Sequence, residues 1–313
     1  MDLLGLLQLG YQGRHLMMPE PSDAPQLSAW LSARGDFESR ACRLAFETGL
    51  REQARVRSAL SVRVQPGNLP PRFENQELVL GLAAALVFLS SAFRILLEDN
   101  ARDREFVLAV ARPEWRNRLL EMEDKGWLQF EHGGGVTRME ETLNAIRRDP
   151  PERHGAWVLF DSDALAPGRP SDKALRLRRR CGGDIAFHCL ERRSIENYLP
   201  LLALDHWAAY LAGDRDGRTR AVRAFRSMTP SCRFYYNLKH GFHGDADRTD
   251  RDNVGSLYDD LDEAARQALE HGFGHKIADL FAWHTSSNWE WWMDAGQERE
   301  EGDRMTQELF SRL

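Results

Sequence analysis

Several common features are missing from this 313-residue chain. It has four cysteines, none in a CxxC pair, so neither a disulfide framework nor a zinc ribbon is expected: Cys42, Cys181, Cys189 and Cys232. No Walker A loop, GxGxxG fingerprint or Ser-His-Asp arrangement is legible. The opening residues lack the basic region and long apolar segment of a signal peptide. Together these absences favour a protein of the reducing cytoplasm.

Lysine is also scarce, although lysine and arginine together number 42. The four lysines are Lys125, Lys173, Lys239 and Lys276. Each merits attention, because a lysine can change protonation in a site whereas an arginine cannot. The net charge of −6 gives no overall sign of nucleic-acid affinity. The runs 173–180 and 215–226 are locally basic, and they are either solvated helix faces or a binding surface.

Long apolar runs are rare, and the exception is residues 78–97, interrupted by Ser90, Ser91 and Arg94. Its length would suffice to cross a membrane. The interruptions instead favour a buried helix from Asn75 to Leu89, with Asn75 as its N-cap, followed by a strand. No membrane partner is therefore expected.

The remaining pattern predicts an α/β protein with three parts. Residues 1–74 form a mainly helical N-terminal segment, residues 75–200 alternate strands and helices, and residues 201–313 are helical. Alternation predicts a mostly parallel, Rossmann-like sheet flanked by helices. The expected strands cover residues 94–98, 127–131, 156–161 and 185–189, and the expected helices of the middle part cover residues 101–112, 113–123, 137–148 and 171–181.

Acidic residues follow two of these strands. Glu98 ends the first strand, and Asp161 and Asp163 follow the buried run Trp-Val-Leu-Phe. The carboxyl ends of strands in an open α/β sheet are where ligands gather, and an all-oxygen cluster suits Mg²⁺ or Mn²⁺. The alternative is that each acid caps the next turn. As a set, they favour a metal site.

Two further segments suggest phosphate contacts. Gly133, Gly134 and Gly135 stand between a strand and a helix, where the backbone could approach a phosphate. Arg192 and Arg193 follow the last strand and could grip a phosphate. A tight turn with no ligand is the alternative explanation of the glycines.

Two charged residues further along the chain complete the candidate site. Glu196 is either an additional metal-linked carboxylate or a first-turn acid that faces a helix dipole. Lys239 lies in an aromatic and polar run, and it could stabilise developing negative charge on a leaving oxygen. Taken alone, Lys239 would be interpreted as a surface residue.

In their order along the chain, these motifs resemble the TOPRIM domain of the OLD (overcoming lysogenization defect) family nucleases. The resemblance covers about residues 75–245, a little over half of the chain. The matching positions are Glu98, Asp103, Gly133 to Gly135, Asp161, Asp163, the Glu-Asn-Tyr-Leu-Pro run at 196–200, and Lys239.

The sequence departs from the family pattern after the first glutamate. Asp99 stands where the family usually has glycine, and Asp103 lies one residue further from Glu98 than is usual. The second acidic role therefore falls to either Asp103 or Asp99.

The resemblance implies a nuclease that hydrolyses DNA or RNA with Mg²⁺ or Mn²⁺, using two ions. Glu98, Asp103, Asp161, Asp163 and Glu196 would be the metal ligands, and Lys239 would neutralise transition-state charge. Because no Walker A loop is legible, the resemblance implies a stand-alone TOPRIM protein of the anti-phage defence type, controlled by a separate ABC-type ATPase.

A different class of function stays open. The chain could be a catalytically silent TOPRIM module that binds an ATPase or nucleic acid, whereas a topoisomerase or primase lacks legible support. The aromatic cluster at Trp289, Trp291 and Trp292 could form a core or the interface of a homodimer.

Overall fold

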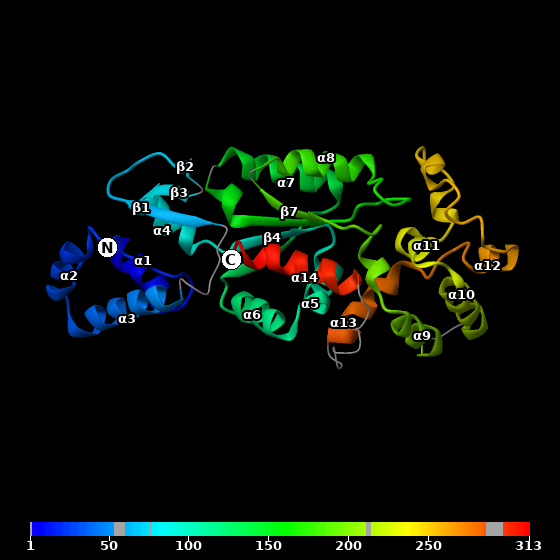
Figure 1. Cartoon of the computed structure of the whole chain (residues 1–313), viewed down its shortest axis with the longest axis horizontal. Coiled ribbons are helices and arrows are strands. Elements are labelled where there is room, and N and C mark those ends of the chain that lie inside the picture. Colours follow the sequence, from blue (N-terminus) through cyan, green and yellow to red (C-terminus); the bar gives the residue numbers. More distant parts are fainter. Residues whose placement is uncertain are drawn as a thin grey trace.

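The computed structural model describes most of the chain. It covers residues 2–52, 60–75, 77–149, 151–183, 185–210, 214–285 and 297–313. Three parts follow one another along the long axis of the molecule: an N-terminal unit, a central sheet with its helices, and a group of helices from the C-terminal region. The last helix, α14 (Gln297–Phe310), returns to the central sheet (Figure 1).

The N-terminal unit combines helices with a small mixed sheet. In it, β1 pairs with β3 in parallel and β2 pairs with β3 in antiparallel orientation. Its core joins Leu6 and Leu9 to Leu78, Leu80 and Ala85. The elements are α1 (Asp2–Tyr11), α2 (Ala24–Ser32), α3 (Asp36–Glu52), β1 (Ser61–Gln65), β2 (Arg72–Glu74), β3 (Glu77–Gly81) and α4 (Leu82–Ser90).

The single helix expected from Asn75 to Leu89 is wrong. Residues 77–81 form β3, and α4 begins only after Gly81, where an added Cβ would lie 2.5 Å from the carbonyl oxygen of Gly67. A short buried apolar strand cannot be told from a buried helix by periodicity. Because β3 and α4 share the N-terminal core, the expected division at residue 75 falls inside this unit.

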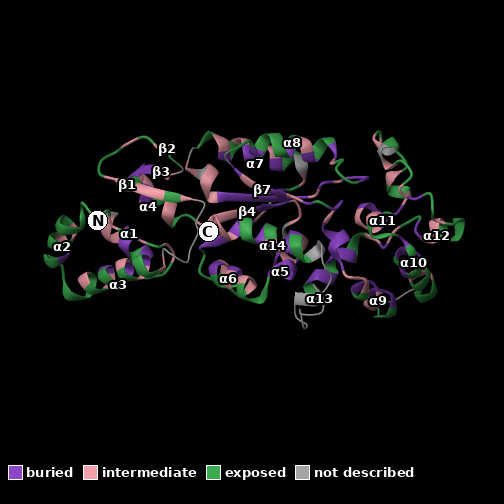
Figure 2. Cartoon of the chain, viewed as in Figure 1, coloured by how far each residue is buried: buried purple, intermediate pink, exposed green. Residues whose placement is uncertain are grey.

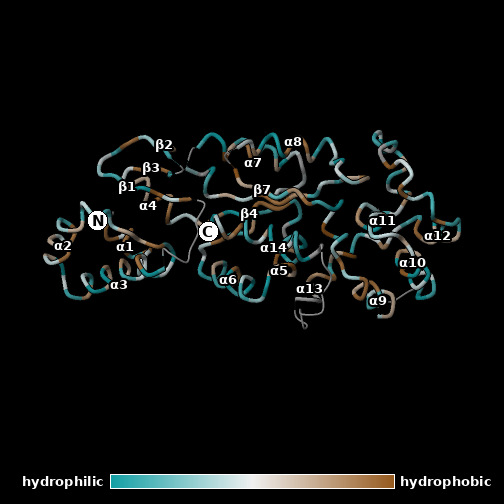
Figure 3. The backbone as a smooth tube through the Cα atoms, in the orientation of Figure 1, coloured by the Kyte–Doolittle hydropathy of each residue, from teal (hydrophilic) through white to brown (hydrophobic). Residues whose placement is uncertain are grey.

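The central sheet has four parallel strands in the order β5-β4-β6-β7, which confirms the α/β class with a parallel sheet flanked by helices. Its strands are β4 (Phe93–Leu97), β5 (Leu128–His132), β6 (Ala156–Phe160) and β7 (Ala186–Cys189). Every residue of β6 is buried, and the middle of this sheet is buried and hydrophobic (Figures 2 and 3).

Helices cover both faces of this sheet (Figure 1). Ile95 and Trp157 point into a core shared with α5, α6 and α14, whereas Leu96 and Val158 point into a core shared with α7 and α8. This alternation follows from the period of two along a strand. The covering elements are α5 (Asn100–Val110), α6 (Pro113–Asp124), α7 (Val136–Arg148), η1 (Glu152–Gly155) and α8 (Asp172–Cys181).

The C-terminal region continues the first of these two cores rather than forming one of its own. The sequence predicts a helix at residues 257–271, but only residues 263–268 are helical, and turns and irregular backbone make up the rest. Its elements are η2 (Ile195–Tyr198), α9 (Leu201–Tyr210), α10 (Arg215–Ser227), α11 (Pro230–Tyr235), η3 (His243–Asp245), η4 (Arg251–Val254), α12 (Glu263–Ala268), η5 (His275–Asp279), α13 (Leu280–Thr285) and α14 (Gln297–Phe310).

Among the described residues, no helix combines the length and apolar character needed to cross a membrane. The apolar run at residues 78–97 is instead divided among β3, α4 and β4.

The strand order creates a switch point between β4 and β6. From β4 the chain proceeds to β5 on one side of the sheet, and from β6 it proceeds to β7 on the other. Connections that leave neighbouring strands in opposite directions open a crevice at the carboxyl ends of those strands. Leu97 pairs with Leu159, so the residues that follow β4 and β6 meet at this crevice.

Candidate acidic site at the carboxyl edge of the sheet

Glu98 and Asp161 flank the switch point because each directly follows the last residue of its strand. Asp161 Oδ1 accepts a hydrogen bond from the backbone N–H of Ile195 at 3.1 Å. This bond ties the end of β6 to η2, which carries Glu196. Three segments that are distant in sequence therefore meet at one place.

Asp163 is held in an unusual backbone conformation. Its φ is +49°, in the left-handed region that residues other than glycine seldom adopt. The Asp163 N–H donates to the carbonyl of Arg193 at 2.8 Å, and the Asp163 carbonyl accepts from Nη2 of Arg248 at 3.1 Å. Strained backbone of this kind persists where its surroundings fix it, and it concentrates at functional sites.

The choice between Asp99 and Asp103, which the sequence left open, favours Asp103. Asp103 is 6% exposed, and its Oδ2 accepts from the Asp99 N–H at 2.8 Å. The Asp99 side chain is 50% exposed and pairs with Arg102 at 3.3 Å. Asp103 therefore contributes its charge to the buried cluster, while Asp99 faces solvent.

Glu196 and Lys239 form the interior part of the site. The side chain of Glu196 is 0% exposed, and Nζ of Lys239 lies 2.9 Å from its Oε1. Within the described part of the chain, no hydrogen-bond partner reaches Oε2. A buried carboxylate oxygen without a partner is costly, so it indicates that the native site provides another cationic or donor group.

The carboxylates perturb one another strongly. Burial raises the pKa of Glu98, and the charge of Asp163 adds to this effect while Lys239 opposes it. Burial likewise raises the pKa of Asp161 well above its usual value, again against the opposing charge of Lys239. Burial also raises the pKa of Asp103 to about 7, helped by the charges of Glu98 and Glu196. These acids are therefore close enough to repel one another.

Lys239 is the counter-charge of this cluster. Although burial by itself lowers its pKa, the charges of Glu196 and Asp161 outweigh that effect and raise the pKa above the usual lysine value. The ammonium therefore keeps its proton at neutral pH, which suits a fixed positive charge rather than a proton acceptor.

The donor set fits a hard divalent cation, because it consists of carboxylate oxygens that carry excess negative charge. Among the described residues, no group of three or more His, Cys, Asp and Glu side chains is already arranged to hold an ion. The side chains would have to turn toward one another to do so. The orphaned Oε2 of Glu196 and the mutual repulsion of the acids are the features that a cation would relieve.

The glycine turn has a structural explanation. An added Cβ on Gly133 would lie 2.7 Å from the carbonyl oxygen of Leu97, and the Gly133 N–H donates to that oxygen at 2.6 Å. Gly134 and Gly135 have φ values of +68° and +82°. The turn thus packs the end of β5 against the end of β4, and phosphate binding by its amides stays a prediction.

The side chains of Arg192 and Arg193, which were expected to contact phosphate, are engaged within the fold. Both residues are at most 6% exposed. The Arg192 guanidinium lies over the Phe234 ring at 3.8 Å, and that of Arg193 binds Asp245 through two nitrogens, at 2.7 and 2.6 Å. Their position after a strand suggested exposure, but the C-terminal region covers them.

Two cations near the site were not assigned a role from the sequence. Lys173 lies in the first turn of α8, and its charge lowers the pKa of Glu98, although burial dominates that pKa. Arg248 binds the Asp163 backbone, as described above. Lysine scarcity pointed to Lys173, whereas no sequence signal distinguished Arg248 from the other arginines.

A buried polar network links η2 to α14. Glu301 of α14 accepts from the Tyr198 hydroxyl, and it lies 3.0 Å from His188 Nε2 and 2.8 Å from the Glu191 N–H. Burial alone would raise the pKa of Glu301, but these hydrogen bonds lower it. Through Tyr198, α14 helps to fix the segment that carries Glu196.

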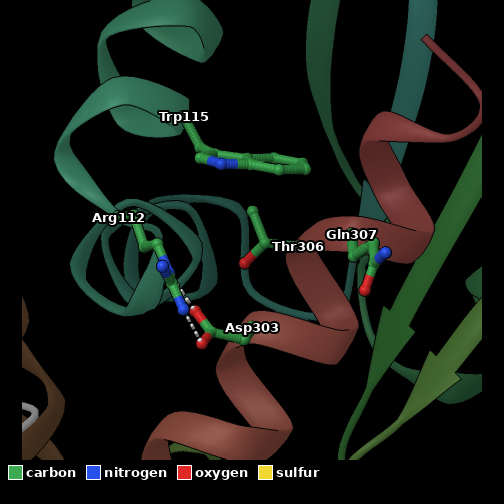
Figure 4. Close-up of a pocket in the computed structure, with 5 residues that line it drawn as sticks. All are labelled: Arg112, Trp115, Asp303, Thr306 and Gln307. Carbon is green, nitrogen blue, oxygen red and sulfur yellow. Dashed lines mark hydrogen bonds and ion pairs between the residues drawn. The ribbon is translucent and has the colours of Figure 1, made fainter. Parts of the chain in front are cut away.

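The described structure also has cavities away from this site. One, of about 140 Å³, separates α6 from α14, and the paired side chains of Arg112 and Asp303 lie at one side of it (Figure 4). Another, of about 300 Å³, is lined by residues that include Trp157, Gly183 and Arg312. None of the acidic site residues lines either cavity. The cluster of Trp289, Trp291 and Trp292 lies outside the described residues, so the expected interface is not seen.

The chain matches no protein-family model, and it has no significant match among curated proteins or solved structures. Functional inference therefore depends on the site itself.

Proposed function

We propose that this chain is a divalent-metal-dependent nuclease that hydrolyses phosphodiester bonds of DNA or RNA. The observation that carries the proposal is the convergence of acids from β4, β6 and η2 around Lys239 at the switch point of a parallel sheet. Strongly perturbed acids in such a crevice are candidates for chemistry rather than for stability. The order of these residues, which resembles a TOPRIM domain of the OLD type, supports the same function.

Each residue has a defined role in this proposal. Glu98, Asp161 and Asp163 would hold Mg²⁺ or Mn²⁺, and Asp103 and Glu196 would complete the donor set. The bound cation would supply Lewis-acid chemistry, by activating water and by neutralising charge on the phosphodiester. Lys239 keeps its proton and would place positive charge beside the reacting phosphate.

A catalytically silent binding module is the second candidate. It is favoured by the arrangement of the described side chains, in which no three potential ligands are placed to hold an ion and Lys239 pairs with Glu196. In either case, a separate ABC-type ATPase partner and a role in anti-phage defence belong to the proposal through the resemblance alone.

The test is cleavage of plasmid DNA and of total RNA by the purified chain. We expect cleavage with Mg²⁺ or Mn²⁺ and none with EDTA. Failure of the chain to cleave either substrate with either metal, alone or with a co-purifying ATPase, would contradict the nuclease proposal and favour the binding module.

Replacement of Lys239 by methionine is expected to lower the cleavage rate by about 100-fold, because it removes the charge beside the phosphate. It should also lower the free energy of unfolding by about 1–3 kcal/mol, since it leaves the Glu196 carboxylate without its partner. Cleavage kinetics and urea denaturation measure the two effects.

A second substitution separates these two effects. Lys239→Met combined with Glu196→Gln should recover stability, because the neutral amide no longer needs a counter-charge. Cleavage should stay low, because this variant lacks both the cation and one of the proposed metal ligands. The matched control is Lys276→Met, since Lys276 is an exposed lysine in η5. Recovery of cleavage in the double variant would show that neither the Lys239 cation nor the Glu196 charge is needed for the chemistry.

A further inference from the structure

The basic run at residues 173–180 forms one exposed surface. In α8, Ala174, Leu177 and Cys181 are buried against the sheet. We define the α8 basic face as the exposed cationic residues of this helix, which are Lys173, Arg176, Arg178, Arg179 and Arg180. The single exposed acid of α8 is Asp172, so the face carries a strong positive charge although the chain is acidic overall.

This helix begins at the acidic site. The Ser171 N–H donates to the carbonyl of Ser162 at 2.8 Å, and Ser162 is the residue between the two aspartates of the DxD pair. The Ser171 hydroxyl then accepts from the Ala174 N–H and caps the helix. Lys173, in the first turn, is, after Lys239, a second cation whose charge reaches Glu98. The first turn of the α8 basic face is therefore adjacent to the candidate site.

From there α8 extends away from the site for about 15 Å, at the usual rise of about 1.5 Å per residue. Arg176 pairs with Glu140 of α7 at 3.1 Å. Among the described residues, no ion pair involves Arg178, Arg179 or Arg180. Arginine binds phosphate through two parallel N–H donors, so these three guanidinium groups are suited to a phosphate backbone.

The second basic run does not have this relation to the site. Helix α10 belongs to the C-terminal group of helices and is well separated from α8 (Figure 1). One of its arginines, Arg226, pairs with Asp205, and the helix itself carries Asp216. Arg215, Arg220 and Arg223 are exposed. Helix α10 therefore provides a matched control of equal charge at a different place.

We infer that the α8 basic face binds the phosphate backbone of a nucleic acid and leads it toward the acidic site. This inference rests on the proposed nuclease function, and it names the surface that holds the substrate. A cluster of several carboxylates with one lysine as counter-charge repels a polyanion, so a cationic surface that begins at the cluster would supply the attraction needed for approach. The contacts are to phosphates, so we expect little sequence preference.

The test is binding of fluorescein-labelled single-stranded DNA, duplex DNA and an RNA hairpin, measured by fluorescence anisotropy in EDTA so that no cleavage occurs. The variant carries Arg178→Gln, Arg179→Gln and Arg180→Gln together. We expect it to lose about 10-fold or more in affinity for at least one probe at low salt. Its slope of log affinity against log salt should become shallower by about 2–3.

The control variant carries Arg215→Gln, Arg220→Gln and Arg223→Gln, and it should bind within about twofold of wild type. Each single α8 substitution is also measured, so that a graded loss is seen even if the triple variant folds poorly. Unchanged binding of the α8 variants, equal losses in both triple variants, or no binding by wild type would each overturn the inference.

Failure of this inference and failure of the proposed function give different results. Metal-dependent cleavage together with α8 variants that bind normally would keep the nuclease and reject the surface. Binding that depends on α8 in a chain that never cleaves would keep the surface and reject the nuclease.

Discussion

Asp161→Asn is expected to lower the rate of metal-dependent cleavage by about 1,000-fold or more, the size of loss typical when a central catalytic group is removed. Asparagine has the shape of aspartate and keeps an Oδ1 that can accept the hydrogen bond from the Ile195 N–H. Only the negative charge is lost. The fold should survive because the shape and the hydrogen bond are kept. Cleavage should be lost because a divalent cation needs the negative charge.

The measurement is single-turnover cleavage of labelled nucleic acid at saturating Mg²⁺, with thermal unfolding as the check on the fold. Calorimetric titration of Mn²⁺ provides a second readout, because metal affinity should fall with the rate. Asp259→Asn is the matched control, since Asp259 is exposed. A rate within tenfold of wild type would remove Asp161 from the catalytic group.

Asp103→Asn is expected to stabilise the metal-free protein while it impairs cleavage. The pKa of Asp103 is raised from 3.8 to about 7, and burial is the main cause. At about 1.4 kcal/mol per pKa unit, the ionised side chain costs up to about 4 kcal/mol of folding free energy above pH 7. Asparagine carries no charge and avoids this cost.

The effect should depend on pH in a defined direction. Between about pH 4 and pH 7 the folded protein holds a proton on Asp103 that the unfolded chain has released. The stability of the wild type therefore falls as pH rises through this window. The difference between variant and wild type should be near zero below pH 4 and should reach its plateau above pH 7.

Urea denaturation in EDTA from pH 4 to pH 8 measures this difference. Added Mg²⁺ should stabilise the wild type most at the upper end of the range, by about 2.7 kcal/mol at a concentration 100 times the dissociation constant. Glu141→Gln is a control, since Glu141 is exposed on α7. If the Asp103→Asn variant is less stable than wild type at pH 8, the ionised Asp103 side chain does not destabilise the folded protein, and the prediction is wrong.

Local pattern was sufficient to identify the candidate acids. Glu98, Asp161 and Asp163 each follow a short apolar run, and such runs became the adjacent strands β4 and β6. Parallel strands place their carboxyl ends at one edge, so the strand assignment alone predicted that these acids would be neighbours. Their role as metal ligands stays a prediction.

Other assignments could not be made locally. The sequence suggested that Arg192 and Arg193 were available for phosphate, but the C-terminal region covers both residues. Burial of this kind comes from residues more than 40 positions away, such as Asp245. The strand at residues 77–81 was missed for a related reason, because only its pairing with β1 and β2 distinguishes it from the start of a helix.

The sequence by itself determined the α/β class, the approximate positions of the central strands and the acids that end them, because these features depend on short-range periodicity and composition. Tertiary structure alone decided that Asp103 rather than Asp99 joins the cluster, that Glu196 pairs with Lys239, and that α8 begins beside the DxD pair. Those outcomes depend on burial and on distances between segments that only folding brings together.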